Sequence, residues 1–175
     1  MASRFSPVNS RPLSPETHSA EEVIRRLDLA PLPTEGGWFR RTAESALRLP
    51  GAERRACSAI LFLVTPEGFS ALHRVDAVET WCFHAGDPLE LLVLGERGAG
   101  RRVVLGADLA AGQTLQTMVP AGAWQGARLR PGGRWGLVSC VVAPEYLAGG
   151  FTLGSRAELC AAYPAFRDAI LVLTR

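Results

Sequence analysis

The sequence predicts a mainly β protein, an antiparallel sandwich or barrel with a short helix near each end. Short apolar runs bounded by Gly, Pro and charged residues recur through the middle of the chain, roughly every 8–12 residues, as in such folds. Helical periodicity is confined to the two ends. With 175 residues, 47% of them hydrophobic, the chain is long enough to bury a core without a disulfide or zinc site.

The N-terminal region divides into a leader and a helix. Residues 1–15 contain Pro, Ser and Arg without an apolar period, which predicts a flexible leader before a single domain over 16–175. Ser19 and Glu22 form a capping box, and the apolar residues of 23–27 recur at helical spacing. We expect the prolines that follow to end this helix.

The central region predicts strands. The expected strands lie at 59–64, 69–75, 78–84, 89–94, 102–105, 113–119, 123–129, 137–142 and 151–153, after an extended stretch that begins at 35–39. Ser155 and Glu158 form a second capping box, for a helix that Pro164 stops. Residues 169–173 fit a closing strand or a helical turn, and propensity does not choose between them.

Charge excludes several classes of function. The net charge is +2, and all nineteen basic residues are Arg, so lysine Schiff-base chemistry and a P-loop lysine are excluded. The arginines are spread along the chain without interleaved aromatic residues, so we expect no nucleic-acid partner. The pairs Arg40-Arg41 and Arg54-Arg55 are interpreted as a solvated face.

Hydropathy and cysteine spacing predict a cytoplasmic protein without a membrane partner. No apolar run approaches the ~18 residues of a membrane span, and the N-terminus lacks a signal-peptide pattern. Cysteines 57, 82, 140 and 160 contain no close pair, which argues against a zinc knuckle or a redox CxxC motif. We expect these cysteines to be buried, unreactive thiols.

Two segments bounded by glycines carry the residues with chemical potential. The first, 68–86, contains His73 and Glu79, and the second, 112–125, ends at Gln125. Both resemble the two motifs of the cupin superfamily. The stretches EGGWFRRT (35–42), SALHRVDAVETW (70–81), GDPLELLVLG (86–95), VPAGAWQGARL (119–129) and SCVVAPEY (139–146) resemble the Cupin_5-type family, which has no agreed activity.

This resemblance covers roughly residues 27–165. It implies a double-stranded β-helix, or jelly roll, with a pocket in its mouth, and it implies a homodimer. It also implies a metal site with two His and one Glu from the first motif and one His from the second. Here Val75 and Gln125 occupy two of the expected His positions. The remaining metal candidates are His73, Glu79 and the amide oxygen of Gln125.

The metal candidates make a weak ligand set. Divalent metals require three or four nitrogen, oxygen or sulfur donors, and a neutral amide is a poor one. We therefore expect no tightly held cofactor, with a divalent metal as the alternative. Side chains alternate faces along a strand, so Trp81 and Phe83 share the inward face of Glu79. Unless a bulge intervenes, His84 then faces outward and is not a ligand.

The remaining pair predicts acid–base catalysis. An imidazole beside a carboxylate can transfer protons at neutral pH, so His73 and Glu79 are the candidate catalytic residues. Gln125 is expected to hydrogen-bond a developing oxyanion, and Trp81 and Phe83 to form an apolar wall against the substrate.

Two further segments leave alternatives open. Glu35 either faces the ligand or precedes a turn that needs Gly36 and Gly37 for positive φ. Trp124 either stacks on a flat or sugar-like substrate or belongs to the core.

The sequence thus predicts a small-molecule enzyme that performs isomerisation, epimerisation, elimination or cyclisation on a carbohydrate-like or natural-product substrate. Two alternatives remain: a metal-dependent oxygenase or hydrolase, and a non-catalytic ligand-binding protein.

Overall fold

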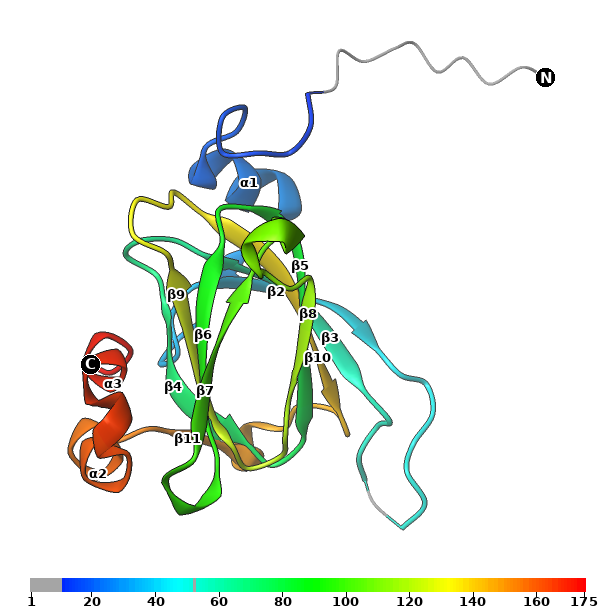
Figure 1. Cartoon of the computed structure of the whole chain (residues 1–175). Helices are drawn as coiled ribbons and strands as arrows, with labels where there is room; N and C mark the ends of the chain where they lie inside the picture. The colour runs from blue at the N-terminus through cyan, green and yellow to red at the C-terminus, as the bar shows by residue number, and fades with distance from the viewer. Residues whose placement is uncertain (1–10, 52) are drawn as a thin grey trace.

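The computed structural model describes residues 11–51 and 53–175, which form two antiparallel sheets packed face to face (Figure 1). The six-stranded sheet has the order β1 (Ala30–Pro31), β2 (Trp38–Glu44), β3 (Ser58–Val64), β10 (Gly136–Ala143), β5 (Val78–Gly86) and β8 (Gln116–Val119). The five-stranded sheet has the order β11 (Phe151–Leu153), β4 (Ser70–Val75), β9 (Trp124–Leu129), β6 (Leu89–Leu94) and β7 (Gly100–Leu105). The predicted mainly β jelly roll is confirmed.

Three short helices flank the sheets. They are α1 (Ala20–Leu27), α2 (Arg156–Ala162) and α3 (Arg167–Val172), and single 3-10 turns lie at Glu96–Gly98, Leu109–Ala111, Ala148–Gly150 and Pro164–Phe166. In Figure 1, α1 covers one end of the sandwich, while α2 and α3 lie beside the five-stranded sheet. Within the described residues, no helix combines the length and the apolar character that a membrane span needs.

The apolar residues gather in three clusters. The largest lies between the sheets and includes Phe62, Trp81 and Leu91, each at most 1% exposed. The second packs α2 and α3 against the five-stranded sheet. The third lies beneath α1, where Val23 meets Trp135 on the outer side of the six-stranded sheet. The inner cluster fills only part of the space between the sheets, and the remainder holds the candidate site.

The helix ends differ in detail from those expected. Ser19 caps α1 by accepting the Glu22 N–H at 3.2 Å, but the helix ends at Asp28, whose backbone is left-handed, before the prolines are reached. Ser155 precedes α2 without a capping hydrogen bond from its side chain. The open question at 169–173 resolves as helix, because Ile170 and Leu173 are buried in the second cluster.

One predicted strand is shorter than expected. β8 begins at Gln116, because Thr114 bonds across to β7, accepting from Gly106 N at 3.1 Å and donating to Val104 O at 2.9 Å. The predicted leader falls mostly on residues 1–10, which lie outside the described residues. Within its last part, the carbonyl of Pro15 accepts a hydrogen bond from Arg134 at 2.8 Å.

Candidate functional site

The candidate site is a cavity of about 70 Å³ between the inner face of the six-stranded sheet and β4. Its polar lining combines acids, an imidazole, a phenol and a guanidinium, set among apolar side chains. The lining residues are Leu32, Glu35, Phe39, Arg41, Ser58, Ile60, Phe62, His73, Val75, Glu79, Cys140, Val142 and Tyr146.

Strand register decides which side chains reach this cavity. Directly opposite residues of antiparallel strands point to the same face. Glu79 lies opposite Val142, and Ile60 lies opposite Cys140, so all four belong to the inner face. Along β5, Glu79 is 6% exposed whereas His84 is exposed. Glu79 faces inward and His84 is exposed, as expected. The alternation of faces is interrupted, however, because Val138 pairs with Phe83 and Leu137 with Ala85, so a bulge in the pairing falls at His84.

His73 lines the cavity, and one of its ring nitrogens is committed to the backbone. Its Nδ1 lies 2.8 Å from the carbonyl oxygen of Ala71, which can only accept, so Nδ1 carries a hydrogen. The neutral ring therefore has Nε2 as its basic nitrogen. Phe151 stacks on the ring at 5.2 Å and fixes its plane.

Glu79 is held by a short hydrogen-bond chain. Trp81 Nε1 donates to Gln125 Oε1 at 2.9 Å, and Gln125 Nε2 donates to Glu79 Oε2 at 2.5 Å. An indole N–H can only donate, so it fixes the orientation of the Gln125 amide and turns its NH₂ group toward Glu79. Burial raises the pKa of Glu79, an effect that the nearby His73 opposes and Glu35 reinforces. Glu79 therefore retains its proton to a higher pH than a solvated carboxyl.

Glu35 enters the cavity from a tight loop before β2. Ser70 Oγ donates to Glu35 Oε1 at 2.7 Å, and the same oxygen lies 3.8 Å from His73 Nδ1. Gly36 and Gly37 have φ of +100° and +73°, which favour glycine. A Cβ on Gly36 would lie 2.5 Å from the carbonyl oxygen of Phe69. Both alternatives that the sequence leaves open therefore hold: the loop needs its glycines, and Glu35 faces the cavity.

Four expected substrate-binding residues do not line this cavity. Trp81 is 1% exposed and packs edge-on against Phe62, and Gln125 is fully buried behind Glu79. Phe83 packs against the inner core. They share the inner faces of the sheets, but the core fills that space beyond Glu79. Trp124 precedes Gln125 by one residue, so it lies on the opposite face of β9, where it packs with the second cluster.

The structure adds polar lining residues that the sequence patterns do not single out, among them Arg41 and Tyr146. Arg41, interpreted from sequence as part of a solvated face, lies opposite Ile60 and lines the cavity. Alternation from Phe39 along β2 is the signal that could find it. Tyr146 lies in the loop after β10, where no sequence periodicity predicts the direction of a side chain. Burial raises the pKa of Tyr146, and Glu35 adds to this effect while Arg41 opposes it, so the phenol keeps its proton at neutral pH.

The arginine pair at 54 and 55 also departs from a purely solvated face. Arg54 donates to both carboxylate oxygens of Asp76, at 2.8 and 3.1 Å, and to the carbonyl of Glu145 at 2.6 Å. The backbone N–H of Arg55 donates to the Glu145 carboxylate at 2.7 Å. Both residues therefore tie the loop after β10 to the start of β3.

The residues present do not fit the metal site that the family resemblance implies. The oxygen of Gln125 accepts from Trp81, and its NH₂ group, which cannot ligate a cation, faces Glu79. Val75 contributes only an apolar wall. Over residues 11–51 and 53–175, no group of three or more His, Cys, Asp or Glu is arranged to hold a metal ion. His73, Glu79 and Gln125 therefore do not form a three-ligand set.

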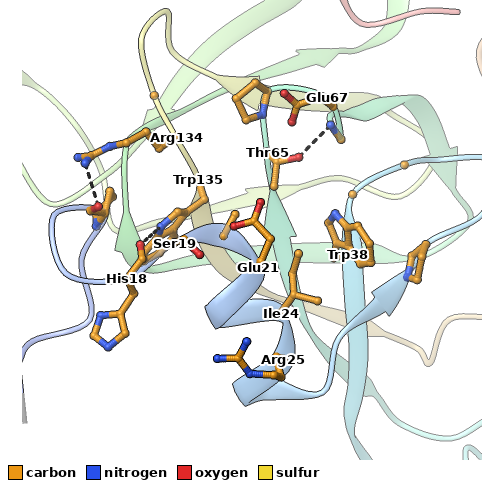
Figure 2. A pocket seen from close by; sticks show the side chains of 18 of the residues that line it. His18, Ser19, Glu21, Ile24, Arg25, Trp38, Thr65, Glu67, Arg134 and Trp135 are labelled. Atoms are coloured by element: carbon orange, nitrogen blue, oxygen red, sulfur yellow. Dashed lines mark hydrogen bonds between the residues drawn. The ribbon is translucent and has the colours of Figure 1, made fainter.

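A larger groove of about 990 Å³ lies outside the sandwich, beside α1 (Figure 2). Several of its polar groups have protein partners. Arg134 donates to Pro15 O and pairs with Glu16 at 2.5 Å, and Trp135 Nε1 donates to His18 O at 2.9 Å. His18 and the acids Glu16, Glu21 and Glu67 also line this groove, but in Figure 2 the His18 ring points away from Glu21 and Glu67. In the inner cavity His73, Glu35 and Glu79 line one small space, which is therefore the candidate active site.

Comparisons with known proteins agree with this architecture. The family model Cupin_5, described as cupin superfamily (DUF985), matches residues 21–154. A hypothetical protein from Leishmania major is 36% identical, with a TM-score of 0.82 over 90% of this chain and 99% of that chain. A protein from Shewanella oneidensis is 34% identical, with a TM-score of 0.83 over 90% of this chain and 98% of that chain.

More distant structures share the fold alone. Oxalate decarboxylase from Bacillus subtilis is 14% identical, with a TM-score of 0.53 over 84% of this chain and 37% of that chain. A cupin 2 conserved barrel domain protein from Rhodopseudomonas palustris is 21% identical, with a TM-score of 0.52 over 84% of this chain and 90% of that chain. No curated protein matches the chain. With the family model covering most of its length, the chain belongs to the Cupin_5 family of the cupin superfamily.

Proposed function

We propose that the protein is a small-molecule enzyme that transfers a proton within its substrate, as in isomerisation, epimerisation, elimination or cyclisation. One observation carries the proposal. A histidine whose Nδ1 is bound to a backbone carbonyl, which leaves Nε2 as the basic nitrogen, and a glutamic acid with a raised pKa line the same small space. A base and an acid held in different protonation states are what proton transfer at neutral pH requires.

His73 is the proposed general base. Its Nε2 removes a proton from a carbon next to a carbonyl group, and the electron pair of the broken C–H bond moves onto the carbonyl oxygen. The imidazolium that forms carries its charge near Glu35, whose Oε1 lies 3.8 Å from Nδ1. Opposite charges at this separation favour the protonated ring. Glu35 thus supports His73 electrostatically.

Glu79 is the proposed general acid. Its retained proton passes to the substrate carbon on the side opposite the abstraction or to a leaving group. The proton taken up by His73 then leaves to solvent and Glu79 regains one from solvent, which restores both groups for the next turnover. The sequence suggests Gln125 for the developing oxyanion, but its NH₂ group is committed to Glu79. The protonated hydroxyl of Tyr146, on the cavity wall, is the better candidate for that hydrogen bond.

Exchange of substrate protons with solvent deuterium tests the proposal without knowledge of the natural substrate. Carbonyl compounds with acidic C–H bonds, including 2-oxo acids and keto sugars, are incubated in D₂O and followed by proton NMR. We expect accelerated exchange with at least one compound. His73→Ala and Glu79→Gln should each slow it by about 10²–10⁴-fold, whereas His84→Ala, whose side chain faces away from the cavity, should match the wild type.

Two results would contradict the proposal. Equal losses from His73→Ala and His84→Ala in folded proteins would remove the distinction between cavity and surface histidines. Binding of a compound without exchange or turnover of any tested compound would favour a non-catalytic ligand-binding protein. The homodimer expected from the family resemblance stays a prediction, and light scattering should give about twice the chain mass of 18.8 kDa.

A further inference from the structure

We propose that the ligand of this cavity is a small organic monoacid whose carboxylate is bound by Arg41 at the outer end of the cavity. The inference deepens the proposed function, on which it rests for the reaction at the inner end. It follows from the position of Arg41, the state of its present partner and the distribution of charge along the cavity.

Arg41 points toward the cavity because of its register. It lies opposite Ile60, and Phe39 lies opposite Phe62 on the same face; all of these residues line the cavity. Arg40 lies opposite Leu61, which packs in the cluster beneath α1 on the outer side of the sheet. Two neighbouring arginines therefore face opposite sides of β2, and only Arg41 places a guanidinium beside the cavity.

The present partner of Arg41 can be exchanged for a ligand. Arg41 Nη1 lies 2.9 Å from Glu44 Oε1, and the two side chains are 35% and 41% exposed. Ion pairs exposed to this extent contribute little to stability. Glu44 also lies 3.5 Å from Arg55 Nε, so it keeps a cationic partner if Arg41 turns to a ligand. Arginine is well suited to such a ligand, since its planar fork binds carboxylates through two hydrogen bonds.

Tyr146 is a further donor on the cavity wall, assigned above to the developing oxyanion, so the ligand carboxylate is left to Arg41. The backbone N–H of Tyr146 donates to Ser58 Oγ at 3.0 Å, which ties the loop to the start of β3. Its phenol keeps its proton and so donates rather than accepts. Phe39, Ile60 and Val142 surround the cavity with apolar surface, which suits a short hydrocarbon body.

The inner end of the cavity favours a ligand with one carboxylate over a ligand with two. Glu35 lies beside His73 there, and its Oε1 already accepts from Ser70. A second carboxylate of a ligand would approach these acceptor oxygens without a positively charged arginine beside it. Like charges in a poorly solvated space repel strongly. A monocarboxylate with a neutral, reactive inner end fits better than a dicarboxylate.

Titration calorimetry at pH 7 with butanoate as the probe tests the inference without requiring turnover. We expect butanoate to bind about tenfold more tightly than 1-butanol, and more tightly than succinate, since a charge-assisted hydrogen bond contributes about 1.5–3 kcal/mol. Arg41→Gln should weaken butanoate binding about tenfold for the same reason. The matched control Arg40→Gln, on the other face of the same strand, should leave the affinity unchanged.

Four results would overturn the inference: no measurable binding of butanoate by the wild type, binding of 1-butanol as tightly as butanoate, equal affinity of wild type and Arg41→Gln, or equal losses from both Arg variants. Melting temperatures of the two Arg variants establish that each remains folded. Failure of the proposed function looks different. Arg41-dependent butanoate binding without proton exchange on any acid would refute catalysis and leave the carboxylate site standing.

Discussion

The two ends of the cavity are built on opposite principles. At the inner end, Glu79 is held from behind by Gln125 and Trp81, which lie in the core outside the cavity. All three are at most 6% exposed, and their side chains form one chain of hydrogen bonds. At the outer end, the side chains of Arg41 and Glu44 are each more than a third exposed. Glu44 also has a second cationic partner, Arg55. The inner end is fixed in geometry and protonation, whereas the outer end can rearrange around a ligand.

This difference separates chemistry from recognition. Buried polar groups are costly to leave unpaired, so a chain of them tolerates no rearrangement. Exposed ion pairs cost little to break, so they can be replaced by ligand contacts. We therefore expect substitutions at the inner end to change stability and protonation, and substitutions at the outer end to change affinity.

The largest expected effect on stability comes from Gln125→Leu. This change leaves the Trp81 N–H and a Glu79 oxygen buried without their partner, and each unpaired buried group costs about 1–3 kcal/mol. We expect a loss of about 4 kcal/mol in the free energy of unfolding, measured by urea denaturation. Arg41→Gln at the outer end should change it by less than about 0.5 kcal/mol. Similar losses from the two variants would remove the contrast between the ends.

A smaller loss is expected from Gly36→Ala, in the loop that carries Glu35. Positive φ costs a non-glycine residue roughly 1–2 kcal/mol, and the new Cβ would also collide with the carbonyl of Phe69. Gly112→Ala is the matched control, because Gly112 has φ of +76° and no other described atom within 4 Å of the added Cβ. Gly36→Ala should destabilise the protein by about 2–3 kcal/mol and Gly112→Ala by about 1 kcal/mol. Equal losses would show that the loop adjusts to the collision.

Comparing the pH dependence of stability in the wild type and in Glu79→Gln isolates the contribution of the Glu79 carboxyl. The pKa of Glu79 is raised above 4.5, so the folded protein binds more protons than the unfolded chain between that pH and the raised pKa. Stability therefore falls as the pH rises through this window. Glu79→Gln has no carboxyl to titrate, so its stability should lack this fall. The difference in unfolding free energy between variant and wild type should therefore change steadily as the pH rises above 4.5. A constant difference would mean that Glu79 ionises as in water.

The smallest expected effect is that of chelation. Gln125 turns a donor toward Glu79 and Val75 replaces a possible ligand with a methyl-bearing wall, so we expect prolonged treatment with EDTA to leave the melting temperature unchanged. Elemental analysis of untagged protein should give well under one transition metal per chain. About one metal per chain, lost together with thermal stability on chelation, would establish a ligand set that this arrangement does not provide.

Period-two alternation explains how much of the site the sequence predicts. Alternation alone places Glu79 inward, and the structure agrees. His84 is exposed as expected, but alternation is not the reason, because the pairing of β5 with β10 skips this residue in a bulge. It does not predict where the cavity ends along a face, because that depends on side chains from several distant strands. Alternation therefore predicts Trp81 in contact with the substrate, yet this residue lies in the core behind Gln125.

Residues outside regular patterns are the hardest to predict. Interpreting Arg41 together with its neighbour Arg40 overlooks that adjacent strand residues face opposite sides. Tyr146 lies in a loop, where side-chain direction depends on tertiary contacts such as its bond to Ser58. For Glu35, the sequence identifies the loop glycines and the acidic side chain, but only the fold brings Ser70 within 2.7 Å of it.

The base and the acid belong to different sheets, since His73 lies in β4 and Glu79 in β5. His73 and Glu79 are only six positions apart, and the chain crosses from one sheet to the other through Asp76 and Ala77. This short crossing and the side chains packed between the sheets together set the gap between the two groups. Phe62, packed edge-on against Trp81 in that core, is one of these side chains. A change in its volume would alter the distance that a proton must travel between His73 and Glu79 without removing any polar group.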